Sequence, residues 1–170
     1  MIAARKGRCC RFDEEELRSL GRNSSGVRGI NIDEDDEVVG AISSNPEAED
    51  ASARTVLVVS EHGFGKRTDP QEYRKTARGA KGVRTINITE KTGPLVAIKY
   101  VTEENDLMII NKSGLTIRMS VNDIRVAGRA TQGVRLINIR EGDSIAAVCP
   151  VPKEEEQEFA PETEETLETN

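Results

Sequence analysis

The stretch GRATQGVRLINI, residues 128–139, decides the fold, because the chain contains it three times. Its counterparts are ARGAKGVRTINI at residues 77–88 and GRNSSGVRGINI at residues 21–32. All three share an early Arg, a central Gly-Val-Arg and a closing Ile-Asn-Ile, and they begin 56 and 51 residues apart. Self-similarity at such a period indicates stacked structural repeats rather than one irregular domain.

The register also extends toward the N-terminus from each stretch. We count positions within a repeat from three reference glycines, Gly7, Gly63 and Gly114. Position 9 is then always acidic (Glu16, Glu72, Asp123), and four positions are always arginine. These four hold 12 of the 16 arginines: Arg11, Arg67 and Arg118 at position 4; Arg18, Arg74 and Arg125 at position 11; Arg22, Arg78 and Arg129 at position 15; Arg28, Arg84 and Arg135 at position 21.

Runs rich in Val and Ile, bounded by Gly, Asp and Asn, predict four short strands in each repeat. In the second repeat they cover residues 56–60, 66–69, 83–89 and 95–101, and in the third 107–111, 115–121, 134–140 and 144–148. Four-stranded units of about 50 residues are typical of propeller-like blades. We therefore predict an all-β array of three four-stranded antiparallel blades.

The predicted blades are residues 1–45, 54–103 and 105–152, followed by an acidic tail at 153–170 that we expect to be disordered. The first strand of repeat 1 would start before Met1, so we expect it to be clipped and the chain to be a fragment of a longer array. The net charge is −6, but the tail alone holds eight Glu and one Lys, leaving 23 basic and 22 acidic side chains in residues 1–152. Any affinity for a charged partner must therefore come from how the charges are arranged.

No arrangement of residues predicts an enzyme. GFGKRT at 63–68 fails as a phosphate-binding loop, because Ser60 stands where the first Gly belongs and Arg67 where Ser or Thr belongs. His62 is the only histidine, so a zinc site or a catalytic triad lacks partners. We expect no catalysis, cofactor or metal in this chain.

The chain also has the features of a cytoplasmic protein. Its three cysteines are an odd number, two of them adjacent, which favours reduced thiols over disulfides. Neither a secretory signal nor an apolar run of about 18 residues is present, so we expect no membrane contact.

EHGFGKRT at 61–68, GRATQGVRLI at 128–137 and EGD at 141–143 closely resemble the C-terminal domain of the DNA gyrase A subunit. The resemblance covers residues 1–152 and matches the last three of that family's six blades and its acidic tail. It implies a β-pinwheel, whose blades exchange strands, and a role in wrapping DNA so that the holoenzyme introduces negative supercoils.

The resemblance also implies which partners the chain has and which functions belong to other parts of the holoenzyme. ATP and Mg²⁺ would bind only in other parts of the holoenzyme. The protein partners would be the other domains of the gyrase A subunit, together with the gyrase B subunit, near the bacterial nucleoid. The family's basic, glycine-rich box is absent, so the related domain of topoisomerase IV remains an alternative. The cleavage domain and its catalytic tyrosine are also absent, so this chain alone should neither cut DNA nor bind ATP. A propeller that binds proteins is a further alternative, although the chain has no Trp, two Tyr and three Phe with which to form an aromatic partner surface.

Arginines repeated once per blade suit the regular charge of duplex DNA, about one phosphate per 1.7 Å of axis. Such contacts need no base reading, so we expect little sequence preference. At position 4 we favour phosphate contact, because these arginines follow a turn on the polar face of a strand. The full predicted DNA-binding set is Lys6, Arg8, Arg11, Arg22, Lys66, Arg67, Arg74, Arg78, Lys81, Arg84, Lys112, Arg118, Arg125 and Arg129.

Structural roles compete with DNA contact at two of these positions. The acid at position 9 and the arginine at position 11 are also placed to form an ion pair within the repeat. The arginine at position 21 is also placed to extend past the edge of the core. The wrapping prediction requires the repeated arginines to share one exposed edge. If Arg67, Arg118 and their counterparts lay on separate faces or were held in internal ion pairs, the prediction would fail whatever the resemblance.

The acidic tail has two interpretations. It serves only solubility, or it competes with DNA for the basic edge at high local concentration. Under the second interpretation, deleting residues 153–170 tightens DNA binding.

Overall fold

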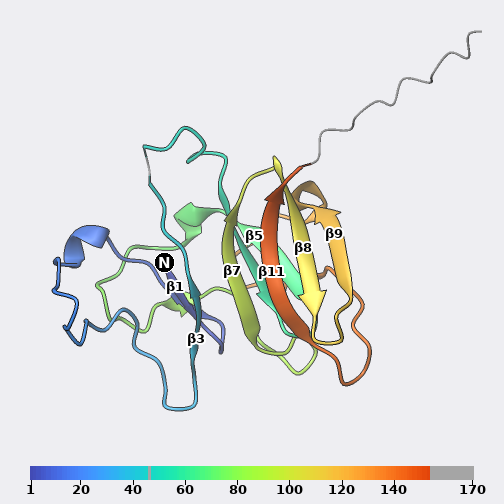
Figure 1. Ribbon diagram of the computed structural model, residues 1–170, viewed down its shortest axis with the longest axis horizontal. Helices are drawn as coiled ribbons and strands as arrows, with labels where there is room; N and C mark the ends of the chain where they lie inside the picture. The colour runs from blue at the N-terminus through green and yellow to red at the C-terminus, as the bar shows by residue number, and fades with distance from the viewer. Residues whose placement is uncertain (46, 154–170) are drawn as a thin grey trace, which may run out of the picture.

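The computed structural model describes residues 1–45 and 47–153, and the acidic stretch 154–170 lies outside them. Three antiparallel sheets stand side by side along the long axis, with repeat 1 at one end and repeat 3 at the other (Figure 1). Repeat 1 contributes β1 (Ile2–Ala4), β2 (Arg8–Cys10) and β3 (Val38–Ala41). Repeat 2 contributes β4 (Thr55–Ser60), β5 (Phe64–Thr68), β6 (Val83–Arg84) and β7 (Leu95–Val101), and repeat 3 contributes β8 (Asn105–Asn111), β9 (Thr116–Ser120), β10 (Val134–Arg135) and β11 (Ile145–Pro152).

The repeats exchange strands, as the resemblance implies. The strand order of the first sheet is β3-β1-β2-β6, so its last strand comes from repeat 2. The second sheet, β10-β5-β4-β7, takes β10 from repeat 3 in the same way. The third sheet has three strands, β11-β8-β9, and no described strand lies beyond β9. The prediction of four-stranded blades is therefore confirmed for two sheets and wrong for the third.

The exchanged strands are much shorter than the sequence pattern predicts. The expected strands at 83–89 and 134–140 are reduced to Val83–Arg84 and Val134–Arg135. The apolar residues that follow serve packing instead, since Ile86 and Ile137 are buried between neighbouring sheets. The first strand, β1, has three residues, whereas its counterpart β4 has six.

The core lies between the sheets, and β4 at its centre contributes to both sides. Val56 and Val58 pack with Cys9 of repeat 1, whereas Leu57 and Val59 pack with residues of repeat 3. Successive side chains of a strand point to opposite faces, so a strand packed on both faces is an unbroken apolar run. The Thr-Val-Leu-Val-Val sequence of β4 has this pattern.

Candidate nucleic-acid interface

The arginines at position 4 are turned toward the neighbouring repeat. Arg67 is only 5% exposed, and its Nε donates to the carbonyl oxygen of Ile124 at 2.7 Å. Arg11 donates through Nη1 to the carbonyl oxygens of Pro70 at 2.7 Å and Tyr73 at 3.0 Å. Tyr73 and Ile124 both occupy position 10, so the same bond joins successive repeats.

This placement contradicts the expectation that position 4 contacts phosphate. Arg67 is buried, and Arg11 is half-buried with its guanidinium held by the next repeat. Arg118 of repeat 3 pairs within its own repeat, Nε to the Asp106 carboxylate at 2.8 Å and Nη2 to the Pro152 carbonyl at 3.0 Å. In repeats 1 and 2 the arginine at position 4 meets the next repeat rather than solvent, whereas Arg118 lies where no described repeat follows.

Lys66 is a second expected DNA contact that the structure buries. Its Nζ donates to the carbonyl oxygens of Gly128 and Arg129, each at 2.5 Å. Burial lowers the pKa of the ammonium group to about 8. Cys10 takes the same place in repeat 1, where its Sγ donates to the Ala77 carbonyl at 3.8 Å. Position 3 therefore fastens each repeat to the loop of the next.

The arginines at position 15 bind back to the preceding repeat. Arg78 donates through Nη1 to the Arg28 carbonyl at 2.7 Å, and Arg129 donates likewise to the Arg84 carbonyl at 2.5 Å. Their backbone N–H groups donate to the carboxylates of Glu16 and Glu72, both at 2.7 Å. Glu16 and Glu72 thus hold the following repeat, and among the described residues no acid at position 9 forms an ion pair with the arginine two residues on.

The arginines at position 11 are left exposed. The side chains of Arg18, Arg74 and Arg125 have no hydrogen bond or ion pair to any described residue. A 3₁₀ helix ends just before each of them: η1 (Glu14–Glu16), η2 (Pro70–Glu72) and η3 (Val121–Asp123). In repeats 2 and 3 the intervening residue, Tyr73 or Ile124, is fully buried, so the next residue lies on the outer surface.

The arginines at position 21 form short-range contacts of their own. Arg28, Arg84 and Arg135 are exposed, and Arg84 and Arg135 donate to the Asn side chains three residues on, at 3.4 and 3.0 Å. Arg135 also lies over the Phe64 ring, 5.2 Å from its centroid. The prediction that position 21 stands at the edge of the core is consistent with this contact.

Wherever two described repeats meet, an arginine at position 15 therefore binds the backbone of the arginine at position 21. Arg129 donates through Nη1 to the Arg84 carbonyl oxygen. Its Nε donates to the carbonyl oxygen of Glu72 at 3.2 Å, and Glu72 precedes Arg74 by two residues. We call Arg74, Arg84 and Arg129 the second junction cluster. The equivalent residues of the preceding junction, Arg18, Arg28 and Arg78, form the first junction cluster, joined by the matching bond from Arg78.

The remaining predicted contacts are exposed and weakly paired. Lys6 pairs with Asp35, Lys81 with Asp33 at 3.7 Å, and Lys112 with Glu61 at 3.9 Å. Arg8 donates to the Gly82 carbonyl at 3.3 Å, and Arg22 is exposed. The predicted set omits three exposed members of the repeated positions, Arg18, Arg28 and Arg135. The repeat register alone was sufficient to find them.

No group of three or more His, Cys, Asp or Glu side chains in the described part of the chain is placed to hold a metal ion. Within residues 1–45 and 47–153, no helix has the length and apolar character that crossing a membrane requires.

Known proteins share both the sequence and the fold of this chain. The family model described as "DNA gyrase C-terminal domain, beta-propeller" matches residues 1–45, 54–102 and 105–152. Relatives include the DNA gyrase A subunit of Staphylococcus epidermidis, 47% identical over 86% of this chain, and that of Staphylococcus aureus, 46% identical over 87%. The chain spans only 16% of the length of either relative.

Solved structures with the same fold include a DNA gyrase A C-terminal domain, with a TM-score of 0.73 and 24% identity over 88% of this chain and 49% of that one. The C-terminal domain of a DNA topoisomerase IV has a TM-score of 0.77 and 21% identity over 89% of this chain and 46% of that one. These two likenesses establish the fold, while the names of the sequence relatives favour gyrase over topoisomerase IV. Because the family model matches all three repeats, this chain belongs to the DNA gyrase C-terminal domain family.

Proposed function

We propose that this chain binds duplex DNA through its junction clusters and bends it along the repeat array, with little regard to sequence. One observation carries the proposal. The arginines at position 11 recur in every repeat, are exposed, and have side chains without a partner among the described residues, while in repeats 1 and 2 the acids that would neutralise them, Glu16 and Glu72, bind the next repeat instead.

The energetics favour a repeated set of contacts over a single strong site. Bending 20–30 bp of DNA by 40–90° costs on the order of 1–6 kcal/mol. A contact that recurs once per repeat offsets this cost along the whole bend. When arginines bind phosphates, counterions are released from the DNA whatever its base sequence. The proposed interface therefore needs no residues that contact the base edges.

In the longer protein, the array would serve as the DNA-wrapping part of the gyrase A subunit. The chain would be non-catalytic, with ATP hydrolysis, Mg²⁺ and DNA cleavage belonging to the B subunit or to other domains, in the bacterial cytoplasm. Family membership supports this assignment, because the relatives are named as DNA gyrase A subunits.

Ligation of a nicked plasmid in the presence of the chain tests wrapping directly. Wrapping traps writhe, so we expect the linking number of the closed product to shift in proportion to bound protein. Arg18→Ala, Arg74→Ala and Arg125→Ala combined should abolish the shift. An unshifted linking number at saturating protein would contradict wrapping.

A further inference from the structure

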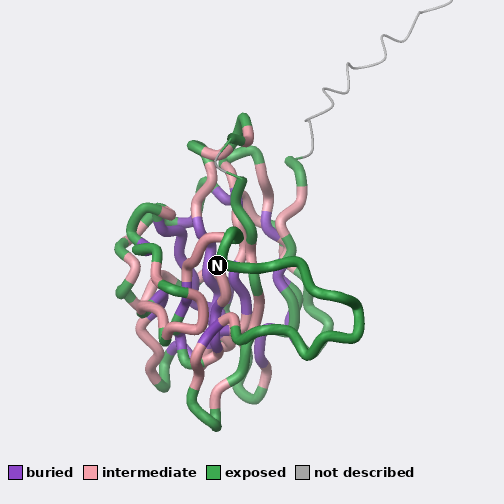
Figure 2. Tube along the Cα trace, turned by 90° about the vertical axis from the view of Figure 1, so that its left-hand side faces the viewer, coloured by how far each residue is buried: buried purple, intermediate pink, exposed green. Residues whose placement is uncertain are grey.

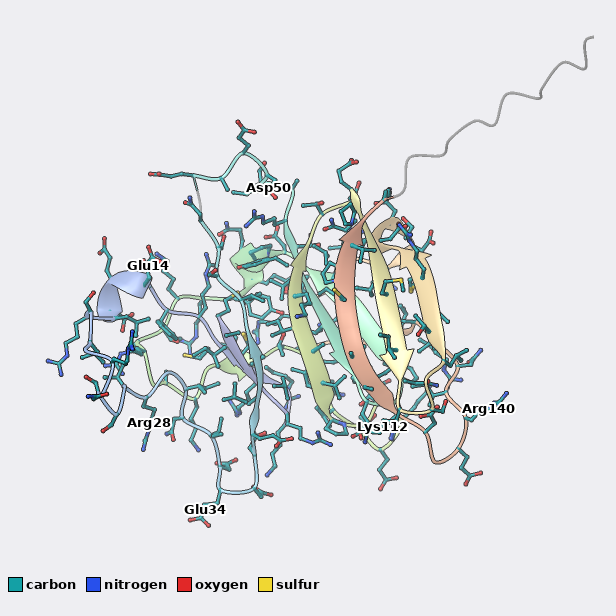
Figure 3. The ribbon with its side chains drawn as sticks, viewed as in Figure 1. Glu14, Arg28, Glu34, Asp50, Lys112 and Arg140 are labelled. Atoms are coloured by element: carbon teal, nitrogen blue, oxygen red, sulfur yellow. The ribbon has the colours of Figure 1, made fainter. Side chains whose placement is uncertain are left out.

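The connection between repeats 1 and 2 is much longer than the next one. It covers residues 42–54, which we call the long linker, whereas residues 102–104 alone connect repeats 2 and 3. The long linker projects past the end of β3 (Figure 1), and Asp50 marks it in Figure 3. None of its described residues is buried, in contrast to the strands of the interior (Figure 2).

A cavity of about 510 Å³ lies between the long linker and repeat 2. This volume is within the range of about 300–1,000 Å³ that is typical of small-molecule sites. Arg11 comes from repeat 1, Tyr100 from repeat 2 and Val126 from repeat 3, so the cavity lies within the array rather than at either end. Its lining includes Arg11, Ser52, Arg54, Asp69, Tyr100 and Val126.

The other two repeats show what the arginine at position 4 ordinarily binds. Arg67 donates through Nη1 to the carboxylate of Glu103, in the short connection, at 3.4 Å. Arg118 donates through Nε to the carboxylate of Asp106 at 2.8 Å. Arg11 has no carboxylate partner among the described residues, and its Nη1 donates to backbone carbonyl oxygens. The guanidinium charge is therefore balanced by an acid in repeats 2 and 3 but not in repeat 1.

The repeat register identifies the residue that replaces the missing acid. Glu103 lies 11 residues before Gly114, and the residue at the same distance before Gly63 is Ser52. Ser52 lines the cavity, so a hydroxyl takes the register position of the carboxylate. This substitution leaves the cavity without the acid that the matching arginine binds in repeat 2.

Arg11 also has nitrogens with which to bind a ligand. Its Nε and Nη2 have no hydrogen bond to a described residue. Among the described residues, the one buried side-chain nitrogen without a partner is Arg78 Nε, so both of these Arg11 nitrogens reach solvent. A guanidinium group binds a carboxylate through short, charge-assisted hydrogen bonds.

The other charges of the cavity favour a ligand with one negative charge. Arg54 is already paired with Asp50, through Nε at 2.9 Å and Nη2 at 2.7 Å. Asp69 accepts from the Gln71 N–H at 2.7 Å as the cap of η2, and its carboxylate would repel a second negative charge. The charge of Arg11 is thus the one left for a ligand to balance.

The remaining lining favours an apolar body on the ligand. Burial raises the pKa of the Tyr100 hydroxyl, and the charges of Arg11 and Arg54 act against that rise, so Tyr100 lies within reach of both. Val126 is 49% exposed and offers an apolar side chain on the cavity wall. We propose that this cavity binds a small organic monocarboxylate, with its carboxylate on Arg11 and its apolar body against Tyr100 and Val126.

Isothermal titration of the full 170-residue chain with benzoate, without DNA, tests this proposal. Benzoate combines one carboxylate with an apolar ring, and it should bind saturably at one site per chain. Benzamide has the same shape without the charge and should bind about tenfold more weakly or worse, because hydrogen bonds to charged groups are the stronger ones. Because DNA is absent, the result is independent of the plasmid test of wrapping.

Two variants of the long linker locate the site without removing Arg11, whose bonds to repeat 2 support the fold. Ser52→Glu restores the acid at the register position of Glu103, so it should pair with Arg11 and abolish benzoate binding. Ser43→Glu adds the same charge at an exposed residue of the same linker outside the cavity lining, and it should bind benzoate like the unmodified chain.

Three results would overturn the proposal. They are the absence of saturable benzoate binding, equal affinities for benzoate and benzamide, and a Ser52→Glu variant that binds benzoate as well as the Ser43→Glu control does.

Discussion

At the residue scale, the same amino acid has different roles according to which repeat lies against it. Arg67 and Arg74 are seven residues apart in one repeat, yet Arg67 is buried and holds a carbonyl of repeat 3, while Arg74 is exposed and unpaired among the described residues. Strand alternation placed Arg67 on a polar face, but sequence cannot show that this face meets a neighbour. Contacts between repeats are non-local, so the local pattern does not predict them.

Replacing Arg67 should therefore affect stability and replacing Arg74 should not. In Arg67→Ala, the Ile124 carbonyl loses a buried donor, which costs about 1–3 kcal/mol of unfolding free energy. Arg74→Ala should change it by less than about 0.5 kcal/mol, as is usual for surface substitutions. Urea unfolding followed by circular dichroism measures both. Equal losses in the two variants would contradict the division of roles.

Lys66 gives a pH-dependent prediction at the same scale. Its pKa is about 8 in the fold, against the ordinary value of 10.5 after unfolding. Between these values the unfolded chain binds more protons, so the contribution of Lys66 to the unfolding free energy becomes more favourable as pH rises above 8. Burial raises the pKa of Cys9 to about 12. Above the ordinary value of 9.0, the contribution of Cys9 to the unfolding free energy therefore becomes less favourable as pH rises.

The window from pH 8 to 9 thus isolates Lys66. Over that range the unfolding free energy of Lys66→Met should rise less with pH than that of the unmodified chain, in parallel urea titrations. Identical slopes for the two proteins would show that the ammonium group keeps its ordinary pKa.

At the scale of the elements, the sequence predicted type and order better than length. The repeated Val and Ile runs correctly predicted β4, β7 and β8 within about two residues. The Val-Arg-x-Ile-Asn-Ile segment was predicted as one strand of seven residues, yet only its first two residues pair. Its alternating isoleucines are buried by packing between sheets, which produces the same pattern as a longer strand.

The short exchanged strands depend on glycines that let two backbones approach closely. A Cβ at Gly133 (φ 82°) would sit 2.6 Å from a backbone oxygen, while Gly26 (φ 77°) has open space. Gly26→Ala should cost about 1–2 kcal/mol from the left-handed backbone alone. Gly133→Ala should cost about 1–3 kcal/mol more through overpacking. Thermal unfolding of the pair checks this, and equal losses would contradict the strand-exchange account.

At the scale of the whole molecule, the all-β repeat fold and the repeated arginines were predictable from internal repetition, and the family was predictable from the resemblance of motifs such as EHGFGKRT at 61–68. What was not predictable is which repeated arginines face outward, because this depends on how the sheets stack. Arg11 and Arg67 at position 4 and Arg78 and Arg129 at position 15 hold the stack together, whereas the side chains at position 11 bind no other described residue and can take a ligand. Family likeness predicted the kind of ligand, and the geometry selects the residues proposed to bind it.

The acidic residues 154–170 lie outside the described residues, but their charge supports a prediction. If they compete with DNA for the junction clusters, deleting residues 153–170 should tighten duplex binding at low salt, as measured by fluorescence anisotropy. The gain should shrink as added salt screens the competition. Unchanged affinity at low salt would favour the solubility interpretation.

The most direct test of the central claim is the salt dependence of duplex affinity. Contacts with about six phosphates predict a log–log slope near −5, and Arg18→Ala, Arg74→Ala and Arg125→Ala combined should make it shallower by about 3. A control that removes the same charge elsewhere, Arg54→Ala, Lys99→Ala and Arg140→Ala combined, should leave the slope nearly unchanged. A triple variant at position 11 that keeps the full slope would contradict the claim that these exposed arginines bind the DNA backbone.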